Sequence, residues 1–123
     1  MEVVIDSHAF FWFLSENPKL SRKAERLVKD ARSVIVPSIV LMEILYLLEK
    51  NNLSFRFVEF LGELKLRKYT VWPLDLSIIA QTLAVDSSLE MHDRIIVATA
   101  EIAKAPIISR DRQIRDMYSN TIW

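Results

Sequence analysis

Four acidic residues stand where their carboxylates could meet in one site. Asp6 and Asp111 each follow an apolar run with strand character, Asp93 stands at the start of a predicted helix, and Glu43 interrupts an apolar helix. Carboxylates that share a cleft repel one another and take up protons unless a cation neutralises them. Together the four acids therefore predict a site for a hard divalent cation, Mg²⁺ or Mn²⁺.

Each acid taken singly also has a structural explanation. Aspartate is a favoured helix N-cap, worth roughly 1 kcal/mol, and all three aspartates precede predicted helices. For Asp93 and Asp111, capping is the simpler interpretation when each is considered alone. Glu43 could lie on a solvent-facing stripe with Tyr46 and Glu49, instead of pointing into a pocket that contains a cation. Capping leaves Glu43 unexplained, whereas a shared metal site explains all four acids.

The chemistry that suits such a site is phosphodiester hydrolysis, because a bound metal lowers the pKa of water and stabilises charge on phosphoryl oxygens. The sequence has no cysteine, which excludes disulfides, thiol nucleophiles and cysteine-ligated zinc. Its single glycine excludes the glycine-rich loops that cradle phosphates. With 16 basic and 16 acidic residues the net charge is zero, so contacts with phosphate must come from local arginines or a bound metal.

The elements that must position the acids alternate between strands and helices. Strands are predicted at 3–5, 34–36, 69–72 and 106–109, with a fifth at 121–123, and helices at 7–16, 20–31, 38–48, 55–64, 76–83, 93–103 and 112–118. Strands that are continuous apolar runs separated by helices indicate a parallel sheet covered on both faces. We therefore predict one α/β domain over residues 1–123, a three-layer α/β/α sandwich with a central parallel sheet of four or five strands.

Two of these helices carry more specific expectations. The segment 38–48 is apolar almost all round, which is typical of a buried helix, and Ser38 is its predicted N-cap. The following helix is predicted to be amphipathic, on the spacing of Phe55, Val58, Leu61 and Leu64. Ligands of open α/β sheets bind beyond the carboxyl ends of the strands, which is where Asp6 and Asp111 stand.

The location of the protein is predicted from what the sequence lacks. The largest unbroken apolar run, residues 9–14, is far shorter than the roughly 20 residues needed to span a bilayer. The N-terminus has no basic region ahead of an apolar stretch, so we expect no signal peptide. A cytoplasmic protein without a membrane partner is the resulting expectation.

The order and spacing of the motifs resemble those of a PIN-domain protein, and specifically of a short VapC-type toxin ribonuclease. A single motif of this kind is common, but the ordered set spans the chain. The matching segments are Val3–His8 with Trp12 and Leu14, Pro37–Ile39 leading to Met42–Ile44, His92–Ala100, and Ile108–Asp111.

This resemblance implies a PIN-like sandwich with an acidic metal centre, and endonucleolytic cleavage of single-stranded or looped RNA that leaves 5′-phosphate and 3′-hydroxyl ends. It makes Asp6 and Asp93 the principal ligands of Mg²⁺ or Mn²⁺, with Glu43 and Asp111 completing the set partly through water. It also implies a homodimer, and a cognate antitoxin whose tail occupies a hydrophobic groove leading to the acids.

Polar residues near the acids have predicted supporting roles. Ser109 is expected to hydrogen-bond a carboxylate or hydroxyl nearby, and Arg110 or Arg112 to contact phosphate. Arg94 is expected to form an internal ion pair. His8 and His92 are interpreted as packing or substrate-contact residues, because proteins of the kind that the sequence resembles require no histidine.

Two other functions fit the sequence less well than a nuclease does. A receiver-like signalling domain needs paired acids after its first strand and a lysine near its last, whereas one acid follows the first strand here and Lys104 precedes its strand. A non-catalytic scaffold that binds RNA or protein needs no acidic set, and the four intact acids argue against it.

Overall fold

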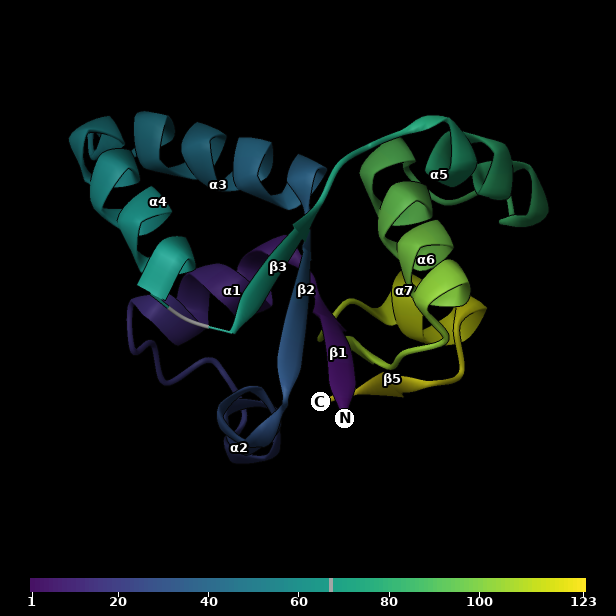
Figure 1. Ribbon diagram of the computed structural model, residues 1–123, viewed down its shortest axis with the longest axis horizontal. Helices are drawn as coiled ribbons and strands as arrows, with labels where there is room; N and C mark the ends of the chain where they lie inside the picture. Colours follow the sequence, from purple (N-terminus) through teal and green to yellow (C-terminus); the bar gives the residue numbers. More distant parts are fainter. Residues whose placement is uncertain (67) are drawn as a thin grey trace.

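The computed structural model describes residues 1–66 and 68–123, and within them five strands alternate with seven α-helices (Figure 1). The strands are β1 (Glu2–Ile5), β2 (Ser33–Pro37), β3 (Tyr69–Trp72), β4 (Ile107–Ile108) and β5 (Thr121–Ile122). The helices are α1 (Ser7–Leu14), α2 (Arg22–Asp30), α3 (Ser38–Lys50), α4 (Phe57–Leu66), α5 (Leu76–Gln81), α6 (Met91–Ala103) and α7 (Arg112–Met117), with 3₁₀ turns η1 (Ser54–Arg56) and η2 (Thr82–Ala84).

The sheet is parallel throughout and has the order β3-β2-β1-β4-β5. Figure 1 shows α1, α3 and α4 on one side of the sheet and α5, α6 and α7 on the other. The core residues of β1, Val3, Val4 and Ile5, are fully buried, as a strand covered on both faces requires. The predicted α/β/α sandwich with a parallel sheet is confirmed.

The strand order also locates the place where a ligand should bind. From β1 the chain first adds β2 and β3 on one side, and later adds β4 and β5 on the other, so the order reverses between β1 and β4. Open α/β sheets bind ligands at such a switch point, and Asp6 and Asp111 follow these two strands. Receiver domains have the order 2-1-3-4-5, so the topology disagrees with the receiver alternative.

Helix α3 is less buried than its composition suggests. Val40, Ile44 and Leu48 form its buried line, but Met42 and Tyr46 are 60 % and 64 % exposed. The prediction of a helix buried all round is therefore wrong, because α3 packs on α1 along one side and leaves Met42 and Tyr46 in solvent.

The start of α3 also differs from the prediction. Pro37 occupies the N-cap position, and no side chain caps the helix. The hydroxyl of Ser38 instead accepts a hydrogen bond of 3.1 Å from the backbone amide of Leu74. Ser38 therefore ties the start of α3 to the segment after β3, because it lies one residue too late to cap the helix.

The predicted spacing for the helix after α3 is wrong for three of its four residues: Leu64 packs against the core, but Leu61 is 37 % exposed. Phe55 and Val58 are exposed, whereas Phe57 and Phe60 pack against the core, with the Phe60 ring 5.3 Å from that of Phe10. The physical reason is the separate 3₁₀ turn Ser54–Arg56, whose three residues per turn shift the face that α4 then presents to the sheet.

Within the described residues, no helix is both long and apolar enough to cross a membrane.

Candidate active site

Asp6 is positioned by the junction between β1 and α1. It is 7 % exposed, and its Oδ1 accepts a hydrogen bond of 2.9 Å from the amide of Ala9, so it caps α1. Burial raises the pKa of Asp6 from 3.8 to about 6, although hydrogen bonds from the Ser109 side chain and the Ala9 amide oppose the rise. The carboxylate therefore serves as a cap and still carries an unfavourable buried charge, which a cation would relieve.

Asp93 lies inside the first turn of α6, because this helix begins at Met91 with Glu90 at the N-cap position. The alternative interpretation of Asp93 as a helix cap is therefore wrong, since the helix starts two residues earlier than expected. Burial and then the charges of Asp111, Glu90, Glu43 and Asp6 raise the pKa of Asp93 from 3.8 to about 7. The other three predicted site acids are therefore close enough to repel this carboxylate.

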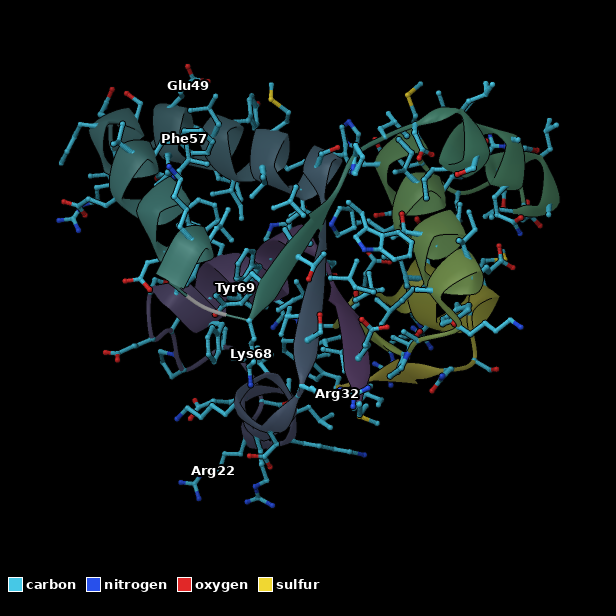
Figure 2. The ribbon with its side chains drawn as sticks, viewed as in Figure 1. Arg22, Arg32, Glu49, Phe57, Lys68 and Tyr69 are labelled. Atoms are coloured by element: carbon cyan, nitrogen blue, oxygen red, sulfur yellow. The ribbon has the colours of Figure 1, made fainter. Side chains whose placement is uncertain are left out.

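Glu43 does not share the solvent stripe of α3. Figure 2 shows Glu49 projecting outward from this helix, whereas the side chain of Glu43 is 29 % exposed and lines a cavity of about 500 Å³. Its Oε1 accepts a hydrogen bond from the buried hydroxyl of Ser7, and its Oε2 lies 3.3 Å from Nδ1 of His92. The first turns of α1 and α6 thus hold the two oxygens of a side chain from α3.

Asp111 is exposed and caps α7, as its sequence position predicts. Its Oδ1 accepts a hydrogen bond of 3.0 Å from the amide of Ile114. Its own amide donates a 3.0 Å hydrogen bond to the hydroxyl of Ser109, which is fully buried. Since the Ser109 side chain also lowers the pKa of Asp6, this serine connects two of the acids.

The arginines near the acids differ in their contacts. Arg110 places its guanidinium carbon 4.7 Å from the centre of the Trp12 ring. Arg94 donates a 2.8 Å hydrogen bond to the carbonyl of Thr82, so its predicted ion pair is replaced, within the described residues, by a backbone contact. Arg112 is exposed at the first position of α7.

The four acids offer the oxygen ligands that a hard divalent cation prefers, although their side chains are not close enough together to surround one. Among the residues that the structure describes, no three acidic or histidine side chains are close enough together to hold a metal ion directly. The charges of three of the acids nevertheless act on Asp93, and all four donors are carboxylates. Mg²⁺ keeps several waters when it binds one or two carboxylates, so bridging water and small side-chain rotations are compatible with this set.

Two residues at the site could not be assigned from the sequence. Ser7 holds Glu43 across a separation of 36 residues, and His92 lies between Glu43 and Glu90, 3.2 Å from an oxygen of the latter. These groups meet because α1 packs on α3 and because the first turn of α6 reaches Glu43 from the other side of the sheet (Figure 1). The position of Ser7 and His92 next to two of the predicted acids was the only available signal.

The sequence matches a known family model and resembles a known ribonuclease. The PIN domain family model matches residues 3–120. The chain is 29 % identical to Ribonuclease VapC22 of Mycobacterium tuberculosis over 117 residues, which cover 92 % of this chain and 89 % of the relative.

Solved structures share the fold at low sequence identity. A toxin–antitoxin complex from Klebsiella pneumoniae superposes with a TM-score of 0.73 at 18 % identity, covering 98 % of this chain and 96 % of that one. VapBC2 from Rickettsia felis, bound to a promoter DNA fragment, gives 0.72 at 15 %, with 99 % and 96 % covered. VapC20 of Mycobacterium tuberculosis, described as a Sarcin-Ricin loop cleaving toxin, gives 0.70 at 15 %, with 93 % of each chain covered. Because the family model matches nearly the whole length of this chain, the chain belongs to the PIN domain family.

Proposed function

We propose that the chain is a metal-dependent endoribonuclease, the toxin of a toxin–antitoxin pair, and that it acts on RNA in the cytoplasm. The observation that carries this proposal is the state of Asp93, whose pKa is raised to about 7 by burial and by the surrounding carboxylates. A site that accumulates negative charge in this way is suited to a cation. Family membership and the likeness to Ribonuclease VapC22 support RNA as the substrate.

The four acids have distinct roles in this proposal. Asp6 and Asp93 bind Mg²⁺ or Mn²⁺ directly, and Glu43 and Asp111 complete the site partly through water. When bound, the cation supplies Lewis acidity toward the scissile phosphate and lowers the pKa of the attacking water. The protein's own contribution is orientation, since Ser7 and His92 fix both oxygens of Glu43, and Ser109 fixes Asp6 relative to Asp111. Cleavage leaves 5′-phosphate and 3′-hydroxyl ends.

The test is cleavage of a labelled RNA by purified protein with Mg²⁺ or Mn²⁺, before and after addition of EDTA. Cleavage should need the metal, stop on chelation and return when excess metal is added. An Asp6→Asn variant purified in parallel shows whether a contaminating nuclease is responsible. Activity that survives exhaustive chelation, or that is equal in the variant, would contradict the proposed chemistry.

A groove between α1, α2, α3 and α4 is the proposed site for the antitoxin tail. It encloses about 1010 Å³, and the apolar part of its lining includes Phe11, Phe13, Leu14, Leu48 and Phe60. Trp12 belongs to the same lining, in the half of α1 remote from Asp6, and its ring lies beside His8 and Arg110, which adjoin the acids in the sequence. Solved relatives that contain an antitoxin share this fold, which supports such a partner.

The surface of α5 and η2 is the proposed homodimer interface. Leu76 and Leu83 are 79 % and 86 % exposed, and Ile79 lies between them in the sequence with half of its surface in solvent. Apolar patches of this kind usually mark protein interfaces. Sedimentation velocity at tens of micromolar should show a dimer that Leu83→Glu dissociates. A wild-type monomer at that concentration would contradict the interface.

A further inference from the structure

Three basic side chains surround the indole ring of Trp12 beside the acidic site. The guanidinium carbon of Arg110 lies 4.7 Å from the ring centre, Nζ of Lys19 lies 5.8 Å from it, and the imidazole of His8 lies 5.6 Å away. The ring of Trp123 packs edge-on at 5.9 Å. These five residues, which we call the Trp12 cluster, come from α1, the segments after α1 and β4, and the end of the chain.

The two long basic side chains of this cluster have unused hydrogen-bond donors. Across residues 1–66 and 68–123, no carboxylate or carbonyl accepts a hydrogen bond from the side chain of Arg110 or Lys19, whereas Lys29 is paired with Glu25 at 2.8 Å. An arginine that stacks its flat face on an aromatic ring keeps its N–H edge available for a bidentate contact with phosphate. Arg110 is exposed, so that edge can be reached.

The position of the Trp12 cluster connects it to the acids. Arg110 stands between Ser109 and Asp111 in the chain, and the charge of His8 lowers the pKa of Asp6. The chain has no net charge, and the acids themselves repel an RNA strand. A local group of unpaired cations next to the acids is therefore the feature that can attract the strand to them.

We propose that the Trp12 cluster binds the RNA backbone adjoining the scissile bond, with Arg110 as the phosphate ligand, Lys19 as a second charge and Trp12 as the rigid support of Arg110. This inference rests on the proposed function, since it deepens the substrate contacts of the same site. The contact is to phosphate and not to a nucleobase, because Trp12 is only 8 % exposed and basic side chains already cover it. A supported arginine loses less conformational entropy on binding than a free one.

The experiment measures binding without cleavage. Fluorescence anisotropy of a labelled single-stranded RNA of randomised sequence is followed in EDTA over a range of salt concentrations, with Asp93→Asn as the parent protein. Arg110→Ala should weaken binding about tenfold and reduce the slope of log K against log salt by roughly 0.7, the value for one phosphate contact on a single strand. Lys19→Gln should reduce the slope similarly, and Arg110→Lys should keep the slope.

The chain offers a matched control. The guanidinium of Arg56 stacks on Phe55 at 5.7 Å in η1, which lies with α3 and α4, so Arg56→Ala removes the same kind of contact and the same charge outside the Trp12 cluster. Binding by Arg56→Ala should match the parent, with circular dichroism verifying that every variant is folded. Equal losses in Arg56→Ala and Arg110→Ala, or an unchanged slope in both Arg110→Ala and Lys19→Gln, would overturn the proposal. The binding assay contains no metal. An unchanged slope of log K against log salt would therefore overturn this proposal alone, whereas the proposed function is tested by metal-dependent cleavage.

Discussion

Two aspartates stand at the starts of successive helices, and the helices use them differently. Asp111 is the N-cap of α7, and its carboxylate is committed to the amide of Ile114. Asp93 lies inside the first turn of α6, and within the described residues its carboxylate accepts no hydrogen bond. Burial and neighbouring charges raise its pKa to about 7.

The comparison shows that a carboxylate at the start of a helix can either cap the helix or remain free to bind another group. An N-cap side chain turns back toward the helix and satisfies a free amide. A side chain in the first turn benefits from the positive end of the helix dipole without being bound to it. Asp93 is therefore the acid with the largest unmet charge, while the carboxylate of Asp111 already stabilises the start of α7.

The largest expected difference between the two residues is in catalysis. Asp93→Asn should reduce kcat/KM for RNA cleavage by roughly a thousandfold, because a direct ligand is lost and several kcal/mol of metal-derived stabilisation go with it. Asp111→Asn should cost only about ten- to a hundredfold, as expected for a group that acts through water or through other ligands. Initial rates at saturating Mn²⁺ test this order, and equal losses would remove the distinction.

The second prediction concerns pH and the buried charge of Asp6. A folded-state pKa raised from 3.8 to about 6 means that the folded protein binds more protons than the unfolded chain between these values. The free energy of unfolding should therefore fall as the pH rises from about 4 to about 7, by roughly 3 kcal/mol for this residue at about 1.4 kcal/mol per pKa unit.

The measurement is urea unfolding in EDTA at several pH values, for wild type and Asp6→Asn. Asparagine keeps the cap but not the charge, so the part of the fall due to Asp6 should be absent from the variant, while the fall due to the raised pKa of Asp93 occurs in both proteins. Hydrogen bonds lower the pKa values of Asp75 and Asp86, so these two residues make the free energy of unfolding rise with pH. They do so in both proteins, and their contribution cancels when the two pH profiles are subtracted. Parallel pH profiles would show that the charge of Asp6 is already compensated.

The third prediction addresses how Glu43 is held. Ser7→Ala should lower the affinity for Mn²⁺ by roughly ten- to a hundredfold, because outer partners of ligands typically contribute that much. Ser7→Thr should restore it, since the hydroxyl is retained. Thr99→Ala, which removes another buried hydroxyl that bonds the Ile95 carbonyl in α6, is the control and should leave calorimetric Mn²⁺ binding unchanged. An equal loss in both alanine variants would make the Ser7 effect merely structural.

The smallest expected effect is on stability without metal. Asp111→Ala should lower the free energy of unfolding by roughly 0.5–2 kcal/mol, the usual cost of losing a cap. Asp93→Ala should raise the melting temperature in EDTA, because it removes a repelled charge and no hydrogen bond. If Asp93→Ala destabilises the protein as much as Asp111→Ala, the two residues do not differ in the way proposed here.

The sheet and the positions of Asp6 and Asp111 could be predicted because they follow from local patterns. Buried parallel strands are continuous apolar runs, and residues just after them must lie at the carboxyl edge of the sheet. The start of α6 could not be placed, because Met91 and His92 carry no start signal and Asp93 resembles a cap. This error of two residues reversed the structural interpretation of Asp93.

Contacts between distant segments were beyond sequence reasoning. The bond from Ser7 to Glu43 depends on α1 lying against α3, and the stacking of Arg110 on Trp12 depends on β4 lying beside β1. The exposed side of α3 was missed because composition shows that a helix is apolar but not how many neighbours cover it. Each of these features is set by packing and not by local sequence.

The most direct test of the acidic site is a crystal structure of the protein with Mn²⁺, in which anomalous scattering locates the ion. We expect an anomalous peak bonded to carboxylate oxygens of both Asp6 and Asp93, at the roughly 2.1 Å typical of such hard cations. Glu43 or Asp111 should lie one water away from the ion. A saturated crystal with no peak between Asp6 and Asp93, or with manganese bound only elsewhere, would contradict the assignment of these acids as the metal site.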